Sequence, residues 1–127
     1  MGKFVIYQTK KGYTFCLKAA NGETIASAPE AYQTLKAVND TVGCIKEYAH
    51  EAPAEDQTKE GYISLPYPKF EIFHDNGQMF RFRLMKAKDT ILAVSESYTA
   101  KANCKNGIKS VSKNSQSAPV IVDIPER

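Results

Sequence analysis

The chain has 127 residues, of which 43% are hydrophobic and 24% are charged, and its formal net charge is +3. These values match ordinary globular domains and exclude collagen-like, disordered and membrane-spanning classes of protein. A chain of this length favours one domain with a shared core, because two independent domains would each be marginally stable. Three cysteines without C-x-x-C spacing favour reduced thiols in the cytoplasm. We expect no cofactor and no membrane partner.

The sequence contains an internal repeat, and a repeat of this size determines the fold. We therefore predict a single domain over residues 1–127, with a first repeat at 1–58, a linker at 59–68 and a second repeat at 69–124. The matching segments are residues 3–7 (KFVIY) with 69–73 (KFEIF), residues 15–17 (FCL) with 82–84 (FRL), and residues 25–26 (IA) with 92–93 (LA).

The first repeat opens with strands. Apolar side chains alternate between two faces over residues 3–7, which is the period of a half-buried strand. Placing Phe4 opposite Phe15 in a hairpin requires a two-residue turn at residues 9–10. Asn21-Gly22 is typical of a tight turn and marks the start of a third strand.

A helix is predicted next, at residues 35–48, with Thr34 as its N-cap. An acidic and weakly extended segment follows at residues 53–58. We interpret the carboxylates around it as a loop cluster rather than an opposed catalytic pair; they are Glu51, Glu55, Asp56 and Glu60. The apolar stripe of the helix consists of Leu35, Val38, Val42 and Ile45.

The second repeat begins with another hairpin. A three-residue turn at residues 75–77 keeps the apolar residues of both strands on one face. This register places Glu71 opposite Arg81 and Phe73 opposite Met79. Both are ordinary stabilising cross-strand pairs.

The second helix is predicted at residues 101–113, with Thr99 as its N-cap. Cys104, Ile108 and Val111 form its apolar stripe (positions spaced by three and four residues). Gly107 inside a helix is unfavourable by about 1 kcal/mol relative to Ala, so we expect another backbone to approach closely there. A β-branched strand at residues 119–124 completes the repeat.

These elements predict an α+β fold in which two tandem β-β-β-α-β units form one mainly antiparallel sheet with pseudo-two-fold symmetry. The segments GKFVIY at 2–7, LKAANGE at 17–23, YTAKA at 98–102 and GIKSVSKN at 107–114 resemble the YegP-like family, small bacterial tandem-repeat proteins of unknown function. The resemblance implies that the last strands are exchanged between the units and that both helices pack on one face of the sheet. It supplies no catalytic residues.

The sheet face away from the helices is the first candidate surface. Its aromatic residues Tyr7 and Phe73 and its basic residues Arg81 and Arg83 are the types that stack on bases and contact phosphates. Cross-strand pairing is the simpler interpretation. Homodimerisation through the apolar patch of Val5, Tyr7 and Phe73 is a third. The face as a whole comprises Val5, Tyr7, Cys16, Lys18, Glu71, Phe73, Arg81 and Arg83.

A lysine ridge on the second helix is the other candidate surface. Four lysines at strict four-residue spacing would attract polyanions in a salt-dependent way. They lie away from the apolar stripe, so a solvated helix face is the simpler interpretation. The ridge consists of Lys101, Lys105, Lys109 and Lys113.

No combination of residues predicts catalysis or a metal site. The cysteines lie in apolar stripes or strands and are not spaced to pair with His50 or His74, so buried inert thiols are expected. We therefore predict a non-enzymatic structural or protein-interaction module of unspecified role, with a protein partner or a second copy of itself. The alternative is weak binding of nucleic acid or another polyanion by the second repeat, since residues 68–127 contain ten basic and six acidic side chains.

Overall fold

The predicted α+β fold of two tandem units is confirmed. The computed structural model describes residues 2–124; Met1, where the predicted first repeat begins, and residues 125–127 lie outside the described part. The first repeat forms β1 (Lys3–Thr9), β2 (Gly12–Lys18), β3 (Thr24–Ser27), α1 (Leu35–Tyr48) and β4 (Ala54–Asp56). The second forms β5 (Lys69–His74), β6 (Phe80–Ala87), β7 (Thr90–Val94), α2 (Lys101–Asn114) and β8 (Val120–Asp123).

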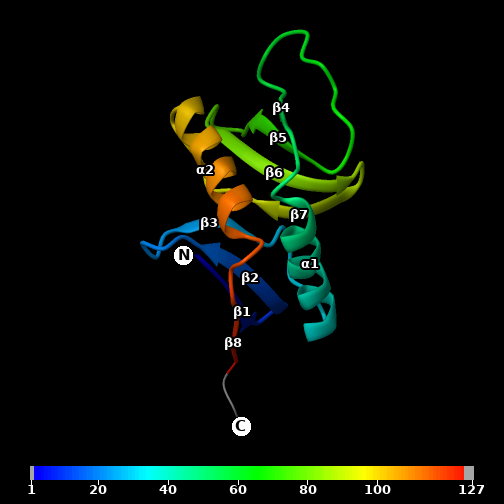
Figure 1. The fold of residues 1–127 in the computed structure, drawn as a ribbon, viewed down its shortest axis with the longest axis vertical. Coiled ribbons are helices and arrows are strands. Elements are labelled where there is room, and N and C mark those ends of the chain that lie inside the picture. The colour runs from blue at the N-terminus through cyan, green and yellow to red at the C-terminus, as the bar shows by residue number, and fades with distance from the viewer. Residues whose placement is uncertain (1, 125–127) are drawn as a thin grey trace.

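The strands form one sheet in the order β4-β5-β6-β7-β3-β2-β1-β8 (Figure 1). Each repeat contributes its last strand to the other: β4 pairs in parallel with β5, and β8 pairs in parallel with β1. The remaining neighbours are antiparallel. The strand exchange implied by the family resemblance is therefore confirmed.

The two halves of the sheet meet at its centre, where β3 and β7 share only the pair Ser27 and Val94. Helix α1 contacts β2, β6 and β7, and helix α2 contacts β6 and β3, so each helix bridges both halves. Beneath them lies one core cluster in which Phe4 and Phe70 are equally buried. Each ring packs edge-on against a partner from the next strand, Phe15 and Phe82 respectively. This equivalence confirms the pseudo-two-fold symmetry.

Each helix is positioned by its apolar stripe, but the two begin differently. Thr34 caps α1 as predicted, because its hydroxyl accepts a hydrogen bond from the Ala37 N–H at 3.0 Å. The prediction that Thr99 caps α2 is wrong: Ala100 is the N-cap residue and makes no side-chain cap. Leu35 was predicted in the buried stripe of α1 and is instead 37% exposed.

Both first hairpins differ from the predicted register by two residues. Phe4 lies opposite Leu17 rather than Phe15, and the turn falls at residues 10–11. In the second repeat Glu71 lies opposite Arg83, and Phe73 opposite Arg81. Contacts in the turn explain the register shift of this second hairpin. The Asp75 carboxylate accepts hydrogen bonds from the N–H groups of residues 77 and 79, and these bonds move the turn. A shift of two residues leaves every side chain on its predicted face.

Candidate functional site

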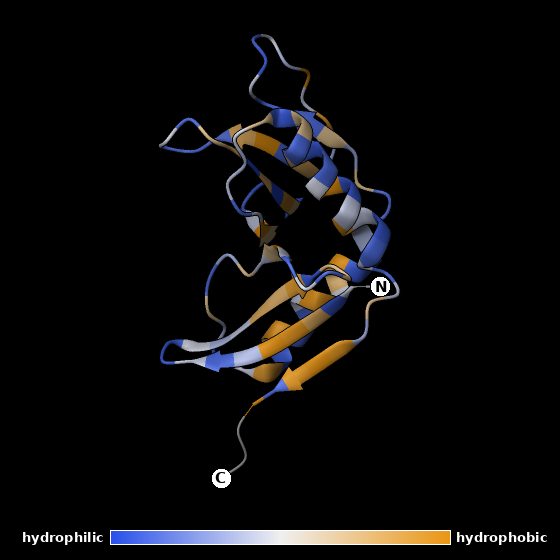
Figure 2. Cartoon of the chain, turned by 90° about the vertical axis from the view of Figure 1, so that its left-hand side faces the viewer, coloured by the Kyte–Doolittle hydropathy of each residue, from blue (hydrophilic) through white to orange (hydrophobic). Residues whose placement is uncertain are grey.

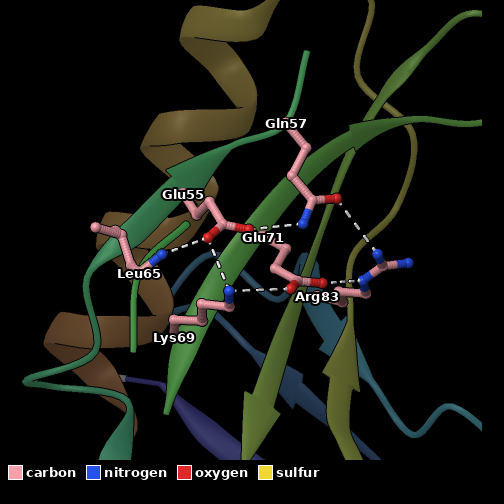
Figure 3. Close-up of polar contacts among 6 residues, drawn as sticks. All are labelled: Glu55, Gln57, Leu65, Lys69, Glu71 and Arg83. Atoms are coloured by element: carbon pink, nitrogen blue, oxygen red, sulfur yellow. Dashed lines mark hydrogen bonds and ion pairs between the residues drawn. The ribbon is translucent and has the colours of Figure 1, made fainter. Parts of the chain in front are cut away.

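A buried ion cluster lies on the sheet face away from the helices, in the second half of the sheet (Figure 3). We use this name for Glu55, Lys69, Glu71 and Arg83. Lys69 Nζ donates a hydrogen bond to Glu55 Oε1 at 2.7 Å and lies 3.6 Å from Glu71 Oε2. Arg83 Nε donates to Glu71 Oε1 at 2.7 Å. Positive and negative charges therefore alternate across β4, β5 and β6.

The linker between the repeats closes over this ion cluster. The Leu65 N–H donates to Glu55 Oε1 at 2.6 Å, and the Tyr67 ring centroid lies 4.5 Å from Lys69 Nζ. Glu55 and Lys69 are each only 2% exposed. Since a buried charge without a partner is strongly destabilising, the mutual pairing is what permits this burial. The predicted loop cluster is corrected accordingly: Glu55 and Asp56 belong to β4 and are paired inside the fold.

The carboxylates of β4 are held in their charged form. Burial alone would raise the pKa of Glu55, but hydrogen bonds from Lys69, Gln57 and the Leu65 N–H outweigh it and hold the pKa at about 2. Burial opposes ionisation of Asp56 too, yet its hydrogen bonds with Thr58 and Lys101 hold its pKa at about 2. The pKa of Lys69 is raised, because the attraction of Glu55 exceeds the effect of its burial.

The arginines predicted for the open face are engaged within the protein. Arg81 Nη2 donates to the Ser95 carbonyl at 2.7 Å, and Nε donates to the same oxygen at 3.2 Å. The Arg83 guanidinium is paired with Glu71 and lies 4.4 Å from the centroid of the Phe73 ring. These contacts support the cross-strand interpretation of Arg81, Arg83 and Phe73.

The structure does not bring Tyr7 and Phe73 together. Tyr7 lies on β1 and Phe73 on β5, with four strands between them. Five strand spacings amount to roughly 24 Å. The apolar patch that was expected to join Val5, Tyr7 and Phe73 therefore falls into two parts at opposite halves of the sheet.

The lysine ridge is only partly free. Lys101 Nζ donates to Asp56 Oδ2 at 2.9 Å and lies 5.7 Å from the Phe80 ring centroid. Lys105, Lys109 and Lys113 are exposed, and no ion pair involves them within residues 2–124. The first ridge lysine thus ties α2 to β4, and the other three face solvent.

β8 is an edge of the sheet, and no residue among 2–124 pairs with or covers its outer side. Its residues Val120, Ile121 and Val122 are 36%, 45% and 52% exposed. Figure 2 shows this outer strand, next to the C-terminus, as hydrophobic over most of its length. The opposite edge, β4, is acidic and is bordered by the linker. Sheets usually protect an edge with charge, proline or a covering segment, and β8 has one charged residue, Asp123, at its end.

The apolar character of β8 continues onto the open face of the first half. Ile121 lies beside Val5, and Val5 lies opposite Cys16. Tyr7 is the next residue of β1 on that face and is 37% exposed. The equivalent row in the second half is Glu55, Glu71 and Arg83. The same positions thus hold paired charges in the second half and apolar side chains in the first, where Ile121 is exposed, Val5 is half-buried and Cys16 is buried. We call Val5, Tyr7, Val120, Ile121 and Val122 the edge surface.

The buried cysteines and the His74 ring make contacts within the fold. Burial raises the pKa of the Cys104 thiol to about 11, with the Asp56 charge adding to the effect. Burial also raises the pKa of Cys16. His74 packs on the Phe80 ring at a centroid distance of 4.7 Å. Across residues 2–124 no three histidine, cysteine or acidic side chains gather as a metal site would require. No helix in this part of the chain is long and apolar enough to cross a membrane.

The sequence placed Glu71 and Arg83, and also Val5 and Tyr7, on the open face, but it indicated neither the buried ion cluster nor the part of the edge surface on β8. Lys69 and Glu71 lie on the same face because side chains alternate along a strand, and this pattern could have indicated part of the ion cluster. β4 has only three residues, too few to show a period, so the burial of Glu55 could not be read. For the edge surface, the strand itself was predicted, but the sequence does not say which strand ends at an edge.

Comparisons with known proteins agree with this fold. A family model described as "Domain of unknown function (DUF1508)" matches residues 9–56 and 70–121, one stretch in each repeat. The UPF0339 protein YegP of Yersinia pestis is 32% identical over 125 residues, which cover 98% of this chain and 96% of that protein. A UPF0339 protein of Treponema denticola is 47% identical over 53 residues, covering 42% of this chain and 91% of the relative, so the relative is about one repeat long.

Two structures solved by NMR in solution show the same fold. The protein of unknown function yegP from E. coli superposes with a TM-score of 0.78 at 22% identity, covering 99% of this chain and 96% of the other. A UPF0339 protein of Shewanella oneidensis gives a TM-score of 0.76 at 20% identity, with 97% and 92% covered. At these identities the likeness concerns the fold alone.

Proposed function

The chain belongs to the DUF1508 family of proteins of unknown function, and from this premise we propose that it is a non-enzymatic protein-interaction module that binds a protein strand at β8. The observation that supports the proposal is the run of three exposed β-branched residues, Val120, Ile121 and Val122, on an uncovered sheet edge. An added strand gains main-chain hydrogen bonds from such an edge and apolar contacts from its side chains.

The contrast between the two sheet edges supports this assignment. At β4, the fold itself supplies the cover, because the linker closes over Glu55. At β8 and the neighbouring Val5 and Tyr7, the described residues supply none. A contiguous exposed apolar surface next to an open edge is typical of a protein interface.

The ionisation of the buried groups supports a non-enzymatic role. A general acid or base works best with a pKa near the operating pH, whereas Glu55 and Asp56 have pKa values of about 2. A nucleophilic cysteine needs a lowered pKa, whereas that of Cys104 is raised to about 11. Buried reduced thiols such as Cys16 and Cys104 also agree with the cytoplasm, which we propose as the compartment.

The alternative, binding of a polyanion, has less support. Arg81, Arg83 and Lys101, three of the cations on which it depended, are used in internal contacts. Nothing in the family comparisons favours nucleic acid. Of the residues predicted for a binding surface, Tyr7 belongs to the one proposed here.

Affinity capture from a lysate of the source organism tests the proposal with a matched pair of variants. Ile121→Lys places a charge in the middle of β8, and Ile63→Lys places the same charge on the 80%-exposed Ile63 of the linker. We expect the wild type and Ile63→Lys to retain the same proteins, and Ile121→Lys to lose them. Capture that is identical for all three chains would contradict a role for the β8 edge.

A further inference from the structure

Within residues 2–124, the backbone groups of β8 that have no partner belong to alternate residues. The Phe4 N–H donates to the Pro119 carbonyl at 2.9 Å, and Phe4 is in register with Val120. In a parallel strand, only every second residue forms backbone hydrogen bonds with a given neighbouring strand. Pro119, Ile121 and Asp123 are therefore the residues that form hydrogen bonds with β1. The N–H and C=O groups of Val120 and Val122 therefore point away from the sheet.

We propose that the strand bound at this edge is β8 of a second copy of the chain, paired antiparallel so that Ile121 of each copy faces the other. This inference rests on the proposed function and names its partner. The register makes Val120 and Val122 of one copy hydrogen-bond with Val122 and Val120 of the other, which uses all the outward groups of both. A two-fold axis passes between the two Ile121 residues, so the interface is closed and self-complementary.

The side chains of β8 fit this register. On the open face, Ile121 meets Ile121, and on the helix face Val120 meets Val122. Pairs of β-branched residues across antiparallel strands are stabilising. The pairing also brings the Val5 and Tyr7 side of each copy toward the other, so that the edge surface becomes continuous across the dimer.

Charge complementarity supports a second copy over an unrelated strand. Lys3 and Lys18 lie directly opposite each other on β1 and β2, and neither they nor Asp123 has an ion-pair partner among the described residues. Within one chain, Lys3 and Asp123 stand at opposite ends of paired strands, roughly 14 Å apart. In the proposed register, Asp123 of one copy faces Pro119 of the other, about 10 Å from the Cα of Lys3. A lysine side chain can span that separation, so the dimer joins the unpaired charges.

Analytical ultracentrifugation over a wide concentration range tests the pairing directly. We expect the wild type to approach twice its monomer mass of 14.1 kDa, and Ile121→Lys to raise the dissociation constant at least tenfold, since it places like charges on the two-fold axis. Ile63→Lys is the matched control and should dimerise as the wild type does. Asp123→Lys should weaken the dimer, and Lys3→Glu combined with Asp123→Lys should restore it.

A disulfide tests the register itself. Residues paired at the two-fold position have Cα atoms about 4.5 Å apart, within the range of a disulfide. In a Cys44→Ser background, Ile121→Cys should therefore form a covalent dimer on mild oxidation. Val122→Cys is the matched control, because residue 122 of one copy faces residue 120 of the other, and it should cross-link far less.

The possible outcomes separate this inference from the proposed function. A chain that stays at 14.1 kDa at every concentration, or a dimer indifferent to Ile121→Lys, overturns the self-pairing. If such a monomer still loses its captured proteins on Ile121→Lys, the interaction module stands with a different partner. If neither mass nor capture depends on Ile121, both proposals fail.

Discussion

Gly107 shows at the level of one residue how tightly the helix layer meets the sheet. A Cβ atom there would lie 2.6 Å from Tyr98 Oη and 2.9 Å from Phe82 Cε2. Phe82 is fully buried in the core and cannot move away freely. Gly43, inside α1, has no such neighbour within 4 Å.

The two glycines therefore predict opposite effects of one substitution. Gly107→Ala should lower the free energy of unfolding by about 1 to 3 kcal/mol, because the clash outweighs the better helix propensity of Ala. Gly43→Ala should raise it by roughly 0.5 to 1 kcal/mol through helix propensity alone. Urea denaturation of both variants beside the wild type measures the difference. If the free energy of unfolding changes in the same direction in both variants, the packing difference between Gly107 and Gly43 is contradicted.

Prediction from sequence succeeded at this residue in one respect and failed in another. A glycine inside an amphipathic helix signalled a close approach, and this is confirmed. The approaching atoms are aromatic rings rather than backbone, which a pattern along one helix cannot reveal. Thr99 failed as an N-cap because α2 begins at Lys101, as predicted, so the N-cap position falls on Ala100, whose side chain cannot accept a hydrogen bond.

Among the elements, β4 depends most on charge. It has three residues, and ion pairs to Lys69 and Lys101 attach it to β5 and α2. Its two carboxylates have pKa values of about 2, below those of about 4 expected in the unfolded chain. Their stabilising effect is therefore complete above the unfolded pKa and is lost as the pH falls through the folded one.

Stability should consequently decline between about pH 4.5 and pH 2. We expect Glu55→Gln and Asp56→Asn to be less stable at neutral pH and to show a flatter decline than the wild type, because each removes one group that binds a proton on unfolding. Glu47→Gln, on the exposed side of α1, should leave the profile unchanged. Thermal unfolding followed by circular dichroism at each pH provides the measurement. An equally steep decline in all variants would assign the acid sensitivity to other groups.

The predictability of each element follows from the length of its pattern. The fourteen-residue helices show a stripe several turns long, and their bounds were predicted almost to the residue. The hairpin strands were placed on the correct faces, since the period of two survives a register error. Their register depended on turn contacts, such as those of the Asp75 carboxylate, which the alternation does not encode. The ion pairs of β4 could not be predicted without knowing that this strand pairs with β5.

For the whole molecule, strand exchange joins the repeats more firmly than the sheet centre does. One residue pair links β3 to β7, whereas β8 pairs with β1 over four positions and β4 with β5 over three. Both helices also contact strands of both repeats. We propose on these grounds that residues 1–127 form one domain, although each repeat resembles a complete unit.

One cooperative unfolding transition should follow. Val38→Ala in α1 and Val111→Ala in α2 each remove buried core atoms. Each should lower the melting temperature of the same transition and reduce the free energy of unfolding by roughly 2 to 3 kcal/mol. Val120→Ala, at the exposed edge, should change it little. Calorimetry in the Ile121→Lys background avoids a contribution from self-pairing and should give equal calorimetric and van't Hoff enthalpies. Two separable peaks, one shifted by each core variant, would contradict a single domain.

The parallel arrangement of β1 and β8 also determines how the chain responds to tension. Gly2 precedes the first rung between these strands, Phe4 with Val120, and Ile124 follows the last, Tyr7 with Asp123. Pulling these two residues apart drags the strands lengthwise past each other, so all the rungs bear the strain together instead of opening one after another. The β1–β8 pair, with one strand from each repeat, thereby becomes a mechanical clamp, and stretching the chain must break it before either repeat can unravel.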